Sequence, residues 1–121
     1  MGEIRPKTIF CDIDGTLVKQ NTASENTQPD QLLTLLPGTA KKLEEWDRNG
    51  YNVILTTGRK ESMRYSTEKQ LRKAGIYYDQ LIMGIGGGKR YLINNRKKHK
   101  DENYALAINL DFDGGVNDII L

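Results

Sequence analysis

The sequence predicts an α/β protein, a three-layer sandwich built on a mostly parallel, doubly wound, Rossmann-like sheet. Two observations indicate this class. Short apolar runs alternate with segments of helical periodicity, as in βαβ crossovers. The first run, residues 9–13, is almost continuously apolar, which is typical of a central parallel strand covered on both faces. We therefore expect helices on the sheet and polar side chains at the carboxyl ends of the strands, where ligands bind in such folds.

Five strands are expected, at residues 7–13, 51–56, 79–83, 90–93 and 105–110. Residues 18–30 are polar and predict a loop or a small hairpin, and residues 94–103 predict a highly charged turn. A chain of 121 residues has no room for a large separate lid in addition to these elements, so no separate cap domain is expected.

Two helices are expected between the first three strands. The first opens at Pro37, in the first-turn position that proline tolerates, and stops at Gly50. Its core-facing residues are expected to be Leu36, Ala40, Leu43 and Trp46. The second runs from about residue 60 to residue 74 and stops at Gly75, and its core-facing residues are expected to be Met63, Thr67, Leu71 and Ala74.

Length and composition fit a globular protein with one domain, residues 1–121. A net charge of +2 is too small to imply nucleic-acid binding by itself. No apolar run approaches the roughly 20 residues that span a bilayer, and no signal-peptide core is present, so a cytoplasmic location and no membrane partner are expected. A lone cysteine, Cys11, agrees with a reducing compartment.

Asp12 and Asp14 follow the first predicted strand directly. Two carboxylates at a strand tip repel each other and are costly to desolvate unless a cation lies between them. Mg²⁺ suits such a pair because it takes one or two carboxylates and fills its shell with water and phosphate oxygens. The alternative is that Asp14-Gly15 is only a turn, which does not explain Asp12 after a buried apolar run. The pattern predicts a phosphate-handling, Mg²⁺-dependent site.

The stretch Asp12-Ile13-Asp14-Gly15-Thr16 after an apolar strand resembles the first motif of the haloacid dehalogenase superfamily of phosphohydrolases. The resemblance implies that Asp12 is a nucleophile that forms an aspartyl-phosphate, and that Asp14 is the general acid and base. Both contribute to the metal site in that family, and Gly15 and Thr16 are expected to contact substrate.

Thr57-Gly58-Arg59 resembles the second motif of the same family. The resemblance implies that the hydroxyl of Thr57, in preference to that of Thr56, binds the transferring phosphoryl group. Gly58 is expected to contact substrate. Arg59 is expected either to bind phosphate with its guanidinium fork or to be a surface residue at a helix start.

The third motif of the family is a basic residue, for which Lys89 is the candidate and Arg90 the alternative. The glycines at 84–88 do not form a P-loop, because their spacing is one residue short. The fourth motif usually supplies an acidic metal ligand, and here Asn94 and Asn95 stand in its place. These amides, or else Asp101 or Glu102 from the charged turn, are expected to complete the metal shell.

The basic run at residues 96–100 is expected to be a solvated loop that also attracts anionic substrates. His99 is expected to belong to this surface. The acidic tail at residues 110–115 is expected either to line the site or to form an oligomer contact.

The resemblance implies a small capless phosphatase, for which either large substrates or a second subunit acting as a lid are expected. The leading expectation is hydrolysis of a small phosphomonoester such as a sugar phosphate, as in phosphatases associated with capsular polysaccharide synthesis. One alternative is a phosphatase for nucleic-acid ends, as in the phosphatase halves of polynucleotide kinases. The other is a degenerate binding or scaffold protein.

Overall fold

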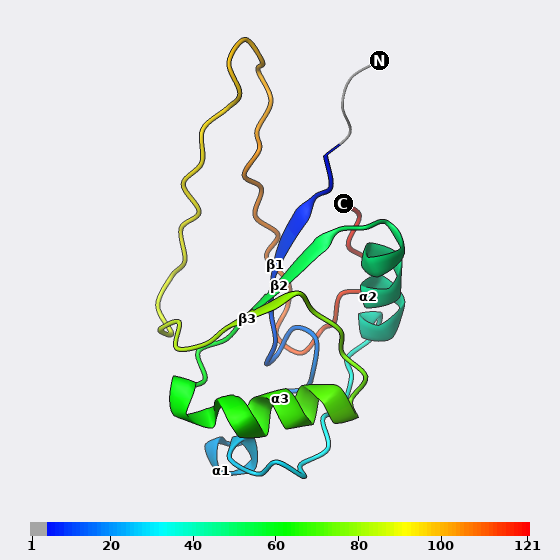
Figure 1. The fold of residues 1–121 in the computed structure, drawn as a ribbon, viewed down its shortest axis with the longest axis vertical. Helices are drawn as coiled ribbons and strands as arrows, with labels where there is room; N and C mark the ends of the chain where they lie inside the picture. Colours follow the sequence, from blue (N-terminus) through cyan, green and yellow to red (C-terminus); the bar gives the residue numbers. More distant parts are fainter. Residues whose placement is uncertain (1–4) are drawn as a thin grey trace.

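The computed structural model describes residues 5–121, and the first four residues of the predicted 1–121 domain lie outside this range. Strands β1 (Thr8–Asp12), β2 (Asn52–Thr56) and β3 (Gln80–Ile82) form a parallel sheet in the order β1-β2-β3. Helices α2 (Thr39–Arg48) and α3 (Arg64–Lys73) lie between successive strands (Figure 1). The predicted α/β class is therefore confirmed, and no separate cap is present in the described range.

The hydrophobic core lies on one face of this sheet. Register pairs Cys11 with Leu55, so alternation along the strands places both side chains on the same face. They pack in one buried cluster with Leu43 of α2 and Leu71 of α3. Both crossover helices therefore cover the same face. The opposite face, which carries Phe10, has no helix over it in residues 5–121 and leaves that ring 53% exposed.

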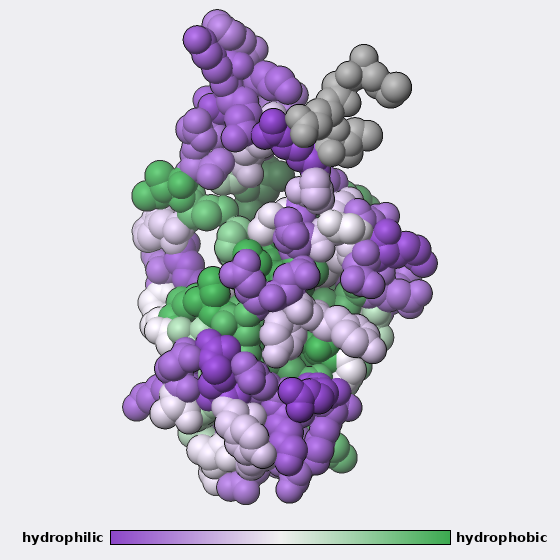
Figure 2. Space-filling view, in the orientation of Figure 1, coloured by the Kyte–Doolittle hydropathy of each residue, from purple (hydrophilic) through white to green (hydrophobic). Residues whose placement is uncertain are grey.

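The predictions of a fourth strand at residues 90–93 and a fifth at residues 105–110 are wrong, because neither segment forms a strand in the described chain. Residues 84–110 contain neither helix nor strand and form one long loop that extends away from the helices (Figure 1). Ile93 is 93% exposed. β1 is consequently an edge strand of the described sheet, with β2 as its partner. The charged tip of the loop forms the purple projection at the top of Figure 2, and hydrophobic side chains gather in the middle of the molecule below it.

The two long helices form where periodicity predicts them, but the residues that they bury differ in part from the predicted core-facing residues. Leu43 and Trp46 of α2 are buried as expected, but Ala40 is exposed and Thr39 and Lys42 are buried instead. Polar partners explain this, because the hydroxyl of Thr39 donates to the Leu17 carbonyl at 2.6 Å, and Lys42 Nζ donates to the Ile119 carbonyl at 2.6 Å.

The second helix begins with a 3-10 turn, η1 (Glu61–Met63), which leads directly into α3. Thr67 and Leu71 face the core as predicted, and Ser66 and Gln70 are buried beside them. The predicted stop at Gly75 is confirmed by its left-handed backbone, as is the stop of the first helix at Gly50.

The polar segment at residues 18–30 combines a short hairpin-like contact with a helical turn. Val18 forms an antiparallel bridge with Leu35, which agrees with the expected hairpin. The turn α1 (Ala23–Asn26) was not expected. Thr22 and Glu25 close it with a capping box, in which each side chain binds the backbone of the other residue.

The tail, residues 111–121, returns to the body of the protein. Val116 is fully buried in the core, and its backbone N–H donates to the Pro37 carbonyl at 2.9 Å. Phe112 lies against Gly15, where a Cβ atom would meet the ring at 3.1 Å, and the φ of +82° at Gly15 also favours glycine. The acidic tail does not line the pocket, which was one of its two expected places, but lies behind the Asp12–Thr16 turn; an oligomer contact stays a prediction. No helix in residues 5–121 has the length and apolar character to cross a membrane.

Candidate active site

The carboxyl ends of β1 and β2 open into a pocket of about 550 Å³. Asp12 is the last residue of β1, Thr57 directly follows β2, and both line this pocket together with Asp14. Parallel strands bring their carboxyl ends to one edge of a sheet, which is why residues 45 positions apart in the chain meet here. The first two predicted motifs therefore converge on one cavity.

The carboxylate of Asp12 is less tightly held than that of Asp14. Its Oδ2 accepts from the hydroxyl of Thr16 and its Oδ1 from Arg90 Nη1, each over a long 3.4 Å. About a third of the side chain is exposed, at 38%. A carboxylate with weak partners and access to the pocket can approach an electrophile, so the geometry suits a nucleophile.

Asp14 is held by a two-pronged ion pair. Arg59 donates from Nε to Oδ2 at 3.0 Å and from Nη2 to Oδ1 at 2.8 Å. The arginine side chain is only 3% exposed and that of the aspartate 13%. Such a bidentate pair fixes the plane of the carboxylate as well as its position. Arg59 is therefore not the surface residue of the second expectation, because its guanidinium is buried against Asp14. It lines the pocket, and the binding of phosphate by its fork stays a prediction.

A second set of contacts holds the guanidinium from behind. Arg59 Nη1 donates to the hydroxyl of Thr67 at 3.2 Å and to Gln70 Oε1 at 2.8 Å. Gln70 is fully buried, and its Nε2 donates to backbone carbonyls of the pocket rim, those of Glu25 at 3.1 Å and Gln28 at 2.7 Å. Both ends of this amide are satisfied, as a buried polar network requires.

Thr57 is poised to donate a hydrogen bond. Its Oγ1 accepts from the backbone N–H of Arg59 at 3.1 Å, which leaves the hydroxyl hydrogen unused by that contact. Thr56 does not line the pocket. At Gly58 a Cβ atom would meet the Ile85 carbonyl oxygen at 3.0 Å, so glycine lets the start of the long loop approach the site.

The structure brings Arg90 to the site, whereas Lys89 does not line the pocket. The role of Lys89 as the basic residue of the third motif therefore stays a prediction, and its position outside the pocket lining does not support it. Of the other expected substrate contacts, Gly58 lines the pocket, while Gly15 is buried against Phe112 and Thr16 contacts Asp12.

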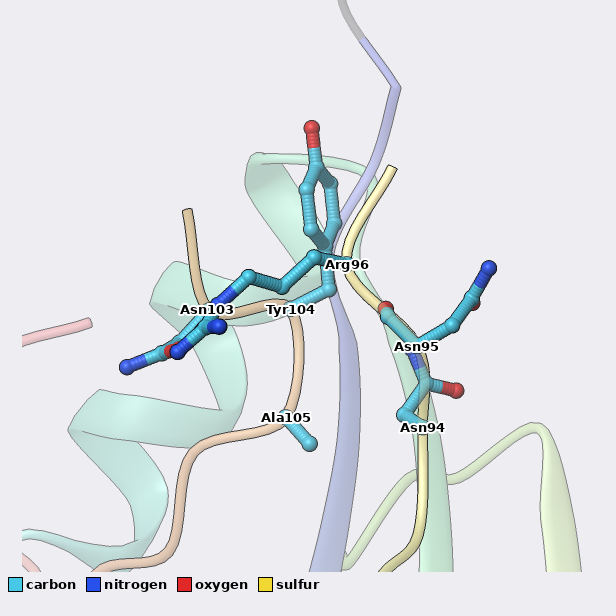
Figure 3. A pocket seen from close by; sticks show the side chains of 6 residues that line it. All are labelled: Asn94, Asn95, Arg96, Asn103, Tyr104 and Ala105. Carbon is cyan, nitrogen blue, oxygen red and sulfur yellow. The ribbon is translucent and has the colours of Figure 1, made fainter. Parts of the chain in front are cut away.

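Asn94 and Asn95 lie elsewhere. They line a separate hollow of about 250 Å³ between the two arms of the long loop, and Arg96 extends across it to Asn103 (Figure 3). Asp101 is exposed, with Arg96 at 3.9 Å. The expected contribution of these amides to a metal shell is not what the structure shows, because the strand that would carry them to β1 does not form.

The described residues contain no group of three or more His, Cys, Asp or Glu side chains that could enclose a metal ion. Mg²⁺ needs less than that, because one or two carboxylates suffice when water and phosphate oxygens complete the shell. Asp12 offers such a carboxylate, and each oxygen of Asp14 keeps one lone pair beyond its hydrogen bond to Arg59. The donor set fits a loosely held Mg²⁺ that binds together with a phosphorylated ligand.

Cys11 lies next to Asp12 in β1 and is not a competing nucleophile. Burial raises the pKa of its thiol to about 12, and the neighbouring Asp12 carboxylate contributes to the shift. Because the thiolate is the reactive form, the side chain stays protonated and inert at neutral pH.

Sequence reasoning missed Gln70 and the buried role of Arg59. The only local signal was the polar character of α3, in which Ser66, Thr67 and Gln70 share the face of Leu71. Three polar residues on a core-facing stripe indicate buried hydrogen-bond partners.

Comparison with known proteins places the chain among hydrolases. A family model described as haloacid dehalogenase-like hydrolase matches residues 9–87, which is more than half of the chain. No curated protein matches the chain.

Several solved structures are similar, of which three are described. A structure of the Pnkp1/Rnl/Hen1 complex matches with 34% identity and a TM-score of 0.56 over 71% of this chain. A second, of the Pnkp1/Rnl/Hen1 RNA repair complex, matches with 29% identity and a TM-score of 0.54 over 82% of this chain. The chain spans only 30% and 28% of those two proteins. A protein from Vibrio cholerae matches in fold, with 20% identity and a TM-score of 0.52, over 73% of this chain and 79% of that one.

Proposed function

The chain belongs to the haloacid dehalogenase-like hydrolases, and we propose that it is a phosphatase that hydrolyses a phosphomonoester at Asp12. The observation that carries this proposal is the convergence of Asp12, Asp14 and Thr57 on one pocket at the carboxyl ends of β1 and β2. Phosphoryl transfer through an aspartyl-phosphate requires a nucleophile, a proton donor and a hydrogen-bond donor to the phosphoryl group. Asp12, Asp14 and Thr57 can supply these groups in that order.

Each group has a distinct task in this proposal. An oxygen of Asp12 forms a bond to phosphorus as the ester P–O bond breaks, while Thr57 and Arg90 stabilise the charge on the phosphoryl oxygens. Asp14 protonates the departing oxygen and later takes a proton from the water that hydrolyses the aspartyl-phosphate. The fork of Arg59 leaves each Asp14 oxygen a second lone pair, so orientation and proton transfer are compatible.

Asp12 would also hold Mg²⁺ through its second carboxylate oxygen. The ion, when bound, would neutralise charge on the phosphate. A pocket of about 550 Å³ also has room for a leaving group, which supports a small ester such as a sugar phosphate as substrate. The link to capsular polysaccharide synthesis, the cytoplasmic location and a second subunit acting as lid stay predictions.

Hydrolysis of p-nitrophenyl phosphate tests the proposal. We expect Mg²⁺-dependent turnover that EDTA abolishes and that Asp12→Asn lowers about a thousandfold or more, because the nucleophile is lost. Asp47→Asn on the exposed side of α2 is the matched control and should retain full activity. Equal rates for Asp12→Asn and the unmodified protein would refute the nucleophile.

A second candidate function is removal of phosphate from nucleic-acid ends. The likeness to the two Pnkp1/Rnl/Hen1 structures favours it, since one of these is an RNA repair complex. The long loop supports it as well, because its exposed basic run at residues 96–100 lies beside a hollow that includes Tyr104, whose ring stacks under Lys97 Nζ at 5.5 Å. Basic side chains with an aromatic ring are typical of single-strand binding surfaces.

Binding of a 3′-phosphorylated RNA oligonucleotide at several salt concentrations tests this second function. If Lys97, Lys98 and Lys100 contact phosphates, we expect replacement of all three by Ala to reduce the salt slope by about 2. Lys41, exposed on α2, serves as the control position. An oligonucleotide that does not bind at low salt would exclude this function while leaving the small-ester phosphatase intact.

A further inference from the structure

Gln70 occupies an unusual place in the molecule. It is 0% exposed, belongs to α3, and is not part of the pocket lining. Nevertheless its two ends reach two parts of the site, since Oε1 accepts from Arg59 and Nε2 donates to carbonyls of the segment 25–28. That segment forms the rim of the pocket through Asn26 and Thr27.

The contacts form a chain from the rim to Asp14. Rim carbonyls fix the amide of Gln70, Gln70 and Thr67 fix Nη1 of Arg59, and the remaining guanidinium nitrogens fix both oxygens of Asp14. Every link joins atoms 2.7–3.2 Å apart, and the three middle members, Gln70, Thr67 and Arg59, are buried. A guanidinium is planar, so holding its Nη1 also sets the plane of the carboxylate opposite.

We propose that Gln70 is a positioning residue that orients the carboxylate of Asp14 through Arg59. This inference rests on the proposed phosphatase function for its kinetic consequence, but not for the structural link itself. Asp14 matters most when the leaving oxygen needs a proton, as an alkoxide does. It matters little when the leaving group is an acidic phenol that departs without one.

The test compares two esters. In Gln70→Met, which is close in size but has no amide, we expect kcat/KM to fall about tenfold more for glycerol phosphate than for p-nitrophenyl phosphate, with KM nearly unchanged. Ser66→Ala is the matched control. The Ser66 hydroxyl anchors the same rim by donating to the Asn26 carbonyl at 3.0 Å, but it does not touch Arg59. We expect it to change both esters equally.

A measurement without turnover separates this inference from the proposed function. Hydrogen exchange of the Arg59 Nε–H, followed by NMR, should become about tenfold faster in Gln70→Met and stay unchanged in Ser66→Ala. If the unmodified protein hydrolyses neither ester, the proposed function fails and the exchange rate alone decides whether Gln70 holds Arg59. Unchanged exchange of the Arg59 Nε–H, or an equal loss of kcat/KM on both esters, would overturn the role of Gln70.

Should Gln70→Met not fold, Thr67→Val is the substitute variant, because it removes the other acceptor of Arg59 Nη1. We expect it to change the exchange rate and the kcat/KM ratio in the same direction.

Discussion

At the scale of single residues, Arg59 lines the pocket while its guanidinium is held by other side chains of the protein. An exposed arginine after Thr57-Gly58 would have been free to reach phosphate. Instead its Nε and Nη2 are paired with Asp14, and its Nη1 donates to Thr67 and Gln70. A buried charge is tolerated when it is paired and its hydrogen bonds are satisfied. Orientation of Asp14 is therefore the task that the structure gives to Arg59.

Thr57 lies where the sequence predicts it, whereas Arg90, the alternative to Lys89, is the basic residue that reaches the pocket. Thr57 directly follows β2, and its backbone N–H donates to the Ile82 carbonyl at 3.0 Å, which continues the pairing with β3. Its hydroxyl is therefore fixed at the sheet edge. Arg90 reaches the same edge from the long loop, with 43% of its side chain exposed. An exposed cation near Asp12 can attract an anionic ester before binding.

At the scale of elements, α1 depends on its capping box. The pKa of the Glu25 carboxyl is lowered, chiefly because the backbone N–H of Thr22 donates to it at 2.9 Å. A lowered pKa means that the stabilising contribution is present above the ordinary pKa of glutamate and is lost as pH falls through the folded value. The rim of the pocket should accordingly loosen in acid.

Titration of the Glu25 carboxyl by NMR tests the cap. We expect Thr22→Ala, which removes the hydroxyl that accepts from the Glu25 N–H at 3.1 Å, to bring the pKa of Glu25 closer to its ordinary value. Thr27→Ala is the control, because its hydroxyl donates to the Ser24 carbonyl and does not touch Glu25. A shift that persists unchanged in Thr22→Ala would contradict the capping box.

Two of the predicted strands do not form, which shows that an apolar sequence pattern alone does not specify strand pairing. Residues 90–93 and 105–110 alternate or run as apolar segments, as strands do, but a strand also needs a partner edge. Here the free edge of β1 is not paired by either segment in the described chain. Asn94 and Asn95 are carried away from the site for the same reason, which removes the expected metal ligands.

At the scale of the whole molecule, the tail stabilises the first motif from behind. Asp113 accepts from the Gln20 N–H at 3.1 Å and donates its own N–H to the Gly15 carbonyl at 2.9 Å, and Val116 fills the core. We expect Val116→Ala to lower the free energy of unfolding by about 2 kcal/mol, because two buried methyl groups are lost and a small cavity remains.

Urea unfolding measures this effect. Ile120→Ala is the matched control, since that side chain is 92% exposed and its truncation should change stability by less than about 0.5 kcal/mol. Equal effects of the two substitutions would show that the tail does not pack as described. Loss of stability at Val116 with little change at Ile120 would place the tail in the cooperative core.

The sequence by itself determined the parallel α/β class, the first three strands, both long helices and the pair of motifs at Asp12–Thr16 and Thr57–Arg59. Those features follow from periodicity, glycine and proline positions and short-range chemistry, which are encoded within a few residues. The tertiary structure alone decided that Arg59 is buried against Asp14, that Gln70 supports it, and that residues 90–93 and 105–110 do not pair with the sheet. Each of these depends on contacts between residues far apart in the chain, whose partners no local pattern specifies.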